Sequence, residues 1–96
     1  MRYLFFSMPA CPKCAAIKDY LKSRKDIEGE ENSLADPEGV IRLRKIYPQI
    51  KEKIKRNEDG SLPIPTILFL SDNEEIVNIA HDLESVKRIV ENKALV

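Results

Sequence analysis

The 96-residue chain has only two cysteines, one histidine and no net charge, and each of these shortages excludes a class of protein. Two cysteines are too few for a disulfide-rich scaffold. A zinc site needs about four ligands, so one histidine beside two cysteines falls short within a single chain. The 16 basic residues balance 16 acidic ones, and a neutral chain is not expected to bind nucleic acid in general.

Long apolar runs are also missing. The run over residues 3–8 is interrupted by Ser7 and stopped by Pro9, so it is too short to span a membrane and is a poor core for a signal peptide. The sequence contains no internal repeat and no low-complexity tract. With 43% hydrophobic residues, an ordinary share for a globular protein, it predicts a single cytoplasmic domain over residues 1–96.

The chain does contain an alternation of strand-like and helix-like segments. Short β-rich apolar runs predict strands, and apolar residues at helical spacing predict helices. Pro48 interrupts the second helical pattern and predicts a kink or two consecutive helices, while Asp72 and Asn73 predict a hairpin turn. The expected strands cover residues 3–6, 27–34, 66–70 and 75–79, and the expected helices cover 12–24, 36–54 and a stretch capped by Asp82.

The order of these segments is β-α-β-α-β-β-α. Strands joined by a helix favour parallel pairing, and the final hairpin adds antiparallel strands. The predicted fold class is therefore α/β, with a four-stranded mixed sheet flanked by helices.

The motif Cys11-Pro12-Lys13-Cys14 lies between the first strand and the first helix. Pro12 suits the first helical position, which places Cys11 at or near the N-cap, where its sulfur can accept hydrogen bonds from the free amides of the first turn. These amides and the helix dipole lower the expected pKa of Cys11 from about 8.5 into the range of about 3.5–7.5, and a nearby Lys13 ammonium adds to the shift. Cys14 lies one turn deeper on the buried side. The motif predicts an exposed nucleophile and a buried resolving thiol.

Other interpretations of the cysteine pair stay open beside the redox one. The two residues could be packing cysteines, or they could bind zinc with His81 as the remaining obvious ligand. A metal or iron–sulfur cluster could be ligated by Cys11 and shared across a dimer. Disulfide exchange through a thiolate does not require a histidine, so we expect His81 to face solvent at the start of the last helix.

In its element order, its Cys-Pro-x-Cys motif and its Ile64-Pro65-Thr66 segment before an apolar strand, the chain resembles the glutaredoxins of the thioredoxin-fold superfamily. The resemblance implies a thioredoxin-like fold with a cis bond at Pro65, close to the cysteine pair. It also implies that the backbone of Ile64 pairs with an extended substrate like an added strand.

The activity that this resemblance implies is reduction of protein disulfides by a thiol–disulfide oxidoreductase. Cys11 attacks the substrate, Cys14 resolves the mixed disulfide, and Pro12, Lys13 and Pro65 support them. No cofactor is bound, and an external reductant supplies the electrons to a protein that is expected to be monomeric. Its expected partners are a disulfide-containing protein and a reductase, with no nucleic acid and no membrane.

The chain departs from the family pattern where glutaredoxins hold glutathione. Met8 stands where the family has a lysine for the glycyl carboxylate, and residues 78–80 replace a Gly-Gly pair before the last helix. Asp82 matches the acidic residue that opens this helix and is the remaining candidate, with Ile64, for binding substrate. We therefore expect poor use of glutathione, and reduction by a thioredoxin-reductase-like protein or a dedicated partner.

Overall fold

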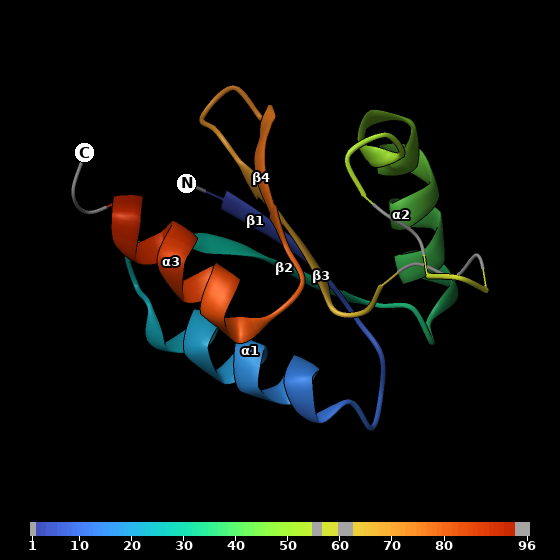
Figure 1. Ribbon diagram of the computed structural model, residues 1–96, viewed down its shortest axis with the longest axis horizontal. Helices are drawn as coiled ribbons and strands as arrows, with labels where there is room; N and C mark the ends of the chain where they lie inside the picture. The colour runs from blue at the N-terminus through green and yellow to red at the C-terminus, as the bar shows by residue number, and fades with distance from the viewer. Residues whose placement is uncertain (1, 55–56, 60–62, 94–96) are drawn as a thin grey trace.

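The computed structural model describes residues 2–54, 57–59 and 63–93, and these contain three helices and four strands in the predicted order (Figure 1). The strands begin and end close to the residues that the sequence predicts, with the last one shifted by one residue. The elements are β1 (Arg2–Ser7), α1 (Pro12–Ser23), β2 (Glu28–Ser33), α2 (Pro37–Ile50), β3 (Thr66–Leu70), β4 (Ile76–Ala80) and α3 (Leu83–Lys93).

The four strands form one mixed sheet in the order β2-β1-β3-β4. β1 runs parallel to β2 and antiparallel to β3, and β3 runs antiparallel to β4. All five residues of β3 are buried, as expected for a central strand covered on both faces, whereas most side chains of β2 are exposed at the sheet edge. The predicted four-stranded mixed sheet is confirmed.

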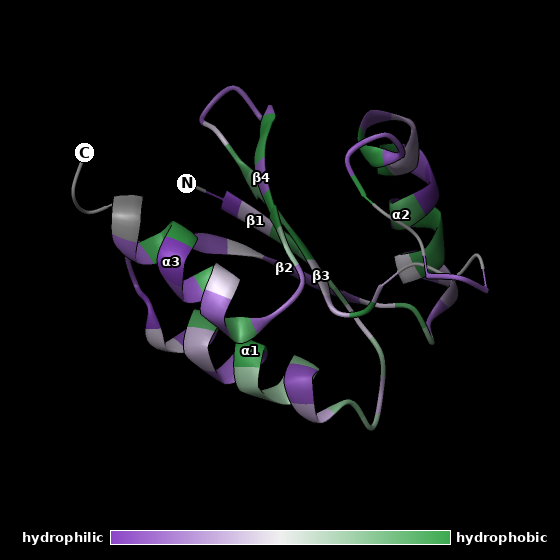
Figure 2. Cartoon of the chain, in the orientation of Figure 1, coloured by the Kyte–Doolittle hydropathy of each residue, from purple (hydrophilic) through white to green (hydrophobic). Residues whose placement is uncertain are grey.

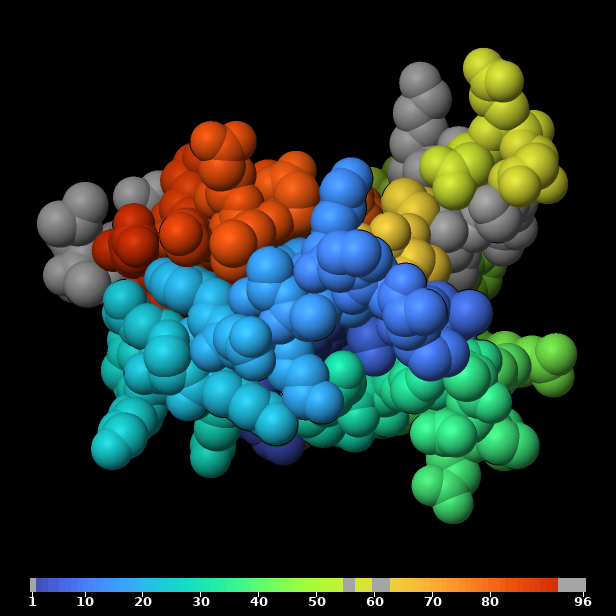
Figure 3. All heavy atoms as spheres, turned by 90° about the horizontal axis from the view of Figure 1, so that it is seen from below, coloured from blue at the N-terminus to red at the C-terminus, as the bar shows by residue number. Residues whose placement is uncertain are grey.

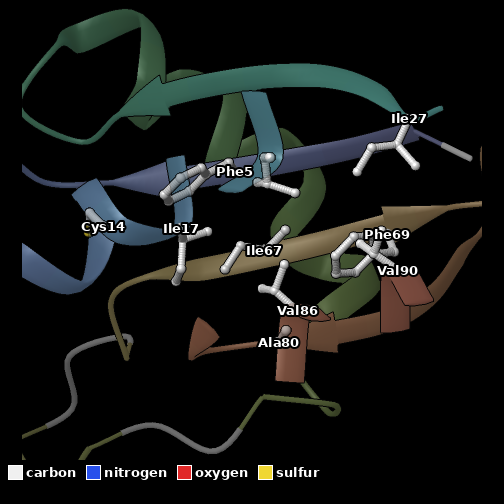
Figure 4. Packing of buried hydrophobic residues seen from close by; sticks show 10 residues of the cluster. Phe5, Cys14, Ile17, Ile27, Ile67, Phe69, Ala80, Val86 and Val90 are labelled. Atoms are coloured by element: carbon white, nitrogen blue, oxygen red, sulfur yellow. The ribbon is translucent and has the colours of Figure 1, made fainter. Parts of the chain in front are cut away.

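One apolar cluster lies between the sheet and the helices α1 and α3, and Figure 4 shows the side chains that form it. Phe5 and Phe69 contribute from the sheet, Ile17 from α1 and Val86 from α3. Cys14 belongs to the same cluster, so the first helix anchors one of the two cysteines in the core. Along α1 and α3 hydrophobic residues alternate with hydrophilic ones, the pattern of helices that bury one face (Figure 2).

A second apolar cluster lies on the opposite face of the sheet, under α2. Leu4, Phe6 and Leu68 come from the strands, and Ile50 and Ile54 come from the end of α2 and the turn after it. Because side chains alternate along a strand, Leu4 and Phe6 face this cluster while Phe5 faces the other. The sheet is thus covered on both faces by helices.

The second helix differs from its prediction at its end. It stops at Ile50 instead of Ile54, and Pro48 lies inside its last turn rather than at a break between two helices. Pro48 has no N–H and so removes one helical hydrogen bond, and the helix ends two residues later. The amides of Lys53 and Ile54 then both donate to the carbonyl oxygen of Ile50 in a turn that keeps Ile54 buried.

Gly39, in the first turn of α2, is expected to resist replacement. A Cβ atom there would overlap the carbonyl oxygen of Ser33 and lie 2.8 Å from its carbonyl carbon. Alanine normally stabilises a helix interior by about 1 kcal/mol relative to glycine. Here we expect Gly39→Ala to destabilise the protein by about 1–3 kcal/mol, because backbone must move to admit the methyl group.

Thermal denaturation measures this effect, since each kcal/mol shifts the Tm of a domain of this size by roughly 4–8 °C. Glu38→Ala is the matched control, because Glu38 is exposed in the same helical turn. A Tm that rises in Gly39→Ala would contradict the close approach of Gly39 to Ser33.

Candidate active site

The cysteine motif lies at the end of the sheet where several chain segments meet. Phe6 pairs with Thr66 and Ser7 pairs with Ser33, so β1 and β2 end where β3 begins. The first turn of α1 follows β1 at this end. In Figure 3 the loop after β1 (blue) lies between the segment before β3 (gold) and the loop after β2 (green).

Cys11 is the N-cap residue of α1, and Pro12 is the first helical residue, as predicted. The Sγ atom of Cys11 accepts a hydrogen bond from the backbone N–H of Cys14 at 3.1 Å. The two cysteines are joined as a disulfide, with their Cα atoms 5.2 Å apart. Cys14 is 4% exposed, whereas Cys11 is half-buried, so the predicted difference in access between the two sulfurs is present.

The surroundings of the two sulfurs favour a thiolate at Cys11 and a neutral thiol at Cys14 once the disulfide is reduced. An amide N–H and the positive end of a helix dipole face the Cys11 sulfur and favour its thiolate. Cys14 packs in the apolar cluster, where a charge is costly. Lys13 is exposed. The geometry therefore provides one accessible nucleophilic sulfur with a second thiol behind it.

Ala10, directly before Cys11, has a φ angle of 57°. Non-glycine residues seldom adopt this left-handed conformation, which carries a cost of order 1 kcal/mol or more and recurs at functional sites. Here it turns the chain from the loop after β1 into the N-cap of α1. The sequence contains no glycine or asparagine at this position to signal the turn.

An open cleft of about 710 Å³ lies beside Cys11 and was not predicted. Its charged lining consists of Lys18 of α1, Glu31 of β2 and Asp36 before α2. Glu31 accepts a hydrogen bond from Ser7 Oγ at 3.0 Å and pairs with Lys18 Nζ at 3.2 Å, while the side chain of Asp36 makes no capping bond to α2. Two carboxylates and one ammonium thus face any molecule that approaches Cys11 from this side.

Ile64 and Pro65 do not line the cleft. The Ile64–Pro65 bond is cis, as the resemblance implies, and Pro65 is buried. Ile64 packs against the same apolar cluster as Cys11, and Cys14 is a member of that cluster. The sequence-predicted residues of these two segments therefore lie at the same end of the sheet and pack against one cluster.

His81 is not solvent-facing, and the prediction for it is wrong. The ring is half-buried, with Nδ1 3.2 Å from the carbonyl oxygen of Pro65 and 3.3 Å from Thr66 Oγ1. The cause is the strand register, because Ala80 pairs with Ile67 and so places His81 beside Thr66. This pairing between distant segments leaves no signal around His81 in the sequence.

Asp82 caps α3, as predicted. Its Oδ1 atom accepts a hydrogen bond from the backbone N–H of Ser85 at 2.7 Å. This bond, together with the Ser85 side chain, holds the pKa of the Asp82 carboxyl below its ordinary value, with smaller contributions from Arg88 and His81. The carboxylate that the resemblance assigns to substrate binding is thus already engaged by its own helix.

Replacing Asp82 should therefore affect stability. We expect Asp82→Ala to lower the free energy of unfolding by about 1 kcal/mol, the typical value of an N-cap, and Asp82→Asn to retain most of the cap. Because the folded-state pKa of Asp82 is lowered, its ionic contribution is complete above the unfolded-state value of about 3.9 and is lost as the pH falls through the folded-state value.

Urea denaturation of the wild type, Asp82→Ala and Asp82→Asn at neutral pH and near pH 3 measures the loss of the cap and its dependence on pH. The stability difference between the wild type and Asp82→Asn should shrink at the lower pH. A difference that grows on acidification would contradict the lowered pKa of Asp82.

Metal binding was the main alternative for the cysteine pair. In the part of the chain that the structure describes, no group of three or more His, Cys, Asp or Glu side chains is placed to hold a metal ion. A metal or iron–sulfur cluster ligated by Cys11 and shared between two chains stays the alternative to the redox function. Among the same residues, no helix is long and apolar enough to cross a membrane.

No protein-family model, curated protein or solved structure matches the chain. The chemistry of the site is therefore inferred from its own residues: a capped sulfur, a buried partner thiol and a cis-proline segment beside them.

Proposed function

We propose that the protein is a glutaredoxin-like thiol–disulfide oxidoreductase with a thioredoxin-like fold that reduces protein disulfides through Cys11 and Cys14. The observation that carries the proposal is the hydrogen bond from the Cys14 amide to Cys11 Sγ at the N-terminus of α1, with the Cys14 sulfur buried behind it. The sheet order β2-β1-β3-β4 and the cis bond before Pro65 support it.

The reaction moves two electrons from the dithiol to the substrate. The Cys11 thiolate attacks one sulfur of the substrate disulfide, the substrate S–S bond breaks, and the other substrate sulfur leaves as a thiolate that takes up a proton. Cys14 then loses its proton and attacks Cys11 Sγ. The mixed disulfide breaks, the second substrate thiol is released, and the Cys11–Cys14 disulfide remains until an external reductant reduces it.

The substrate is a segment of protein in an extended conformation. Ile64 precedes the cis bond and lies at the end of the sheet that carries the cysteine motif, which suits backbone pairing with a strand-like segment that carries the disulfide. The protein needs no bound cofactor for this chemistry, and its second partner is the reductase that restores the dithiol.

A single-turnover reaction tests the function without any knowledge of the reductase. The protein is reduced with dithiothreitol, freed of it, and mixed with a peptide that contains an intramolecular disulfide. We expect the peptide to be reduced in proportion to the protein added, with the Cys11–Cys14 disulfide formed in the same amount. Failure to reduce the peptide would refute the proposal, and iron–sulfur absorbance after anaerobic purification would instead support the dimeric cluster.

A further inference from the structure

A chain of hydrogen bonds joins the residue before α3 to the segment that contains the cis bond. The hydroxyl of Thr66 donates to the carbonyl oxygen of Pro63. A carbonyl oxygen can only accept, so the contact between His81 Nδ1 and the Pro65 oxygen requires a hydrogen on Nδ1. The same hydrogen faces Thr66 Oγ1, whose own hydrogen is committed to Pro63.

Two members of this chain, Thr66 and Pro65, are shielded from water. Thr66 is 2% exposed and Pro65 is fully buried, while the His81 ring is half-buried above them. Hydrogen bonds to acceptors in such a place are costly to break, because the polar atoms left behind find no replacement partner. The imidazole therefore fixes the backbone of residues 63–66 to the end of β4.

We propose that His81 is a positioning residue that holds the Ile64–Pro65 backbone in place for an extended disulfide substrate. The inference rests on the proposed function, since it assigns His81 to the edge on which that substrate docks. His81 does not touch the reacting sulfurs in this role. Its Nδ1–H acts through the carbonyl oxygen of Pro65 and the hydroxyl of Thr66.

If His81 positions this backbone, an extended peptide disulfide should depend on His81 more than a small disulfide does. An extended peptide uses the backbone beside Pro65, so its reaction depends on the position of that segment. A small disulfide such as bis(2-hydroxyethyl) disulfide needs only access to Cys11 Sγ. Loss of the His81 contacts should therefore lower the rate for the peptide relative to the rate for the small disulfide.

Two substitutions, His81→Asn and His81→Gln, distinguish the effect of the hydrogen-bond donor from the effect of losing the ring. The Nδ2 atom of an asparagine is bonded to Cγ, as Nδ1 of histidine is, so His81→Asn keeps a donor at the same place. His81→Gln carries its amide one atom further out and loses the contact. Glu84→Gln, at an exposed position on α3, is the matched control.

The measurement is the second-order rate constant for oxidation of each reduced variant by the peptide and by the small disulfide. In His81→Gln we expect the ratio of the two constants to fall by about two- to tenfold, the effect of one lost hydrogen bond. His81→Asn and Glu84→Gln should keep the wild-type ratio. An unchanged ratio in His81→Gln, or an equal fall in both His81 variants, would overturn the proposal.

The hydrogen bond itself has a readout that does not depend on activity. His81 is the one histidine of the chain, so its ring nitrogens give unambiguous NMR signals. We expect the neutral ring to carry its hydrogen on Nδ1, and a neutral ring with its hydrogen on Nε2 would overturn the positioning role. A wild type with the expected ring state but no reaction with the peptide would refute the proposed function and leave the hydrogen bond established.

Discussion

Replacing Cys11 with serine should abolish disulfide reduction, whereas replacing Cys14 with serine should preserve the attack and trap the substrate. A serine hydroxyl at the N-cap accepts the same amide hydrogen bond but is not ionised at neutral pH, so no nucleophile remains. Without the Cys14 thiol, the mixed disulfide at Cys11 has no internal thiol to resolve it. Mass spectrometry of each variant after reaction with a peptide disulfide measures both outcomes.

Alkylation of the reduced wild type at neutral pH tests the same difference between Cys11 and Cys14 without a disulfide substrate. Iodoacetamide should modify Cys11 far faster than Cys14, because the first sulfur is accessible and capped and the second is buried. Lys13→Ala is the informative companion, since any change in the Cys11 rate measures what this ammonium contributes. Equal alkylation rates for the two thiols would contradict the role assigned to the helix N-terminus.

Glutathione should be a poor reductant of the Cys11–Cys14 disulfide. Met8 stands where the glutaredoxins, which the sequence resembles, carry a lysine for the glycyl carboxylate, and it is 41% exposed on the wall of the cleft. Loss of a charge-assisted hydrogen bond costs about 1.5–3 kcal/mol, which is roughly ten- to a hundredfold in affinity. Glu31 and Asp36 add two carboxylates to the same cleft.

The remaining cations and acids near the site are poorly placed to replace that lysine. Lys18 already pairs with Glu31, so it would have to leave one carboxylate to bind another. Asp82 caps its own helix. Residues 78–80 stand where glutaredoxins carry a Gly-Gly pair, so a tripeptide that approached the backbone there would meet side chains.

Steady-state turnover with millimolar glutathione, compared with the uncharged reductant dithiothreitol, measures this preference. Met8→Lys should improve the use of glutathione by about tenfold, because it restores a cation beside the cleft, and Met8→Leu should not. Efficient, saturable turnover of the wild type with glutathione would contradict the prediction.

The sequence predicts those parts of the site that depend on neighbouring residues. Cys11 at the N-cap follows from Pro12 at the first helical position, and the cap at Asp82 follows from the helical pattern after it. The strands are predictable because runs such as β3 are apolar throughout. The element order then fixes which strands are parallel, and the mixed sheet follows.

The contacts that the sequence does not predict join residues far apart in the chain. Ser7 meets Glu31 because β1 and β2 pair in one register, and His81 meets Pro65 because β3 and β4 pair in another. A shift of one residue in either register would place other side chains there, and nothing local to these residues selects the observed one. The charged cleft and the histidine contact therefore became visible only with the strands assembled.

Cys11 lies where the loop after β1, the loop after β2 and the segment before β3 meet. Its surroundings therefore exist only in the folded protein. The amide that faces the sulfur points at it only when α1 has formed, and α1 is held by packing against the sheet and α3. A nascent or denatured copy of the chain carries two ordinary thiols with no helix to cap. Unfolding therefore removes whatever rate advantage the helix N-terminus gives Cys11 over an ordinary cysteine, and it also exposes the sulfur of Cys14.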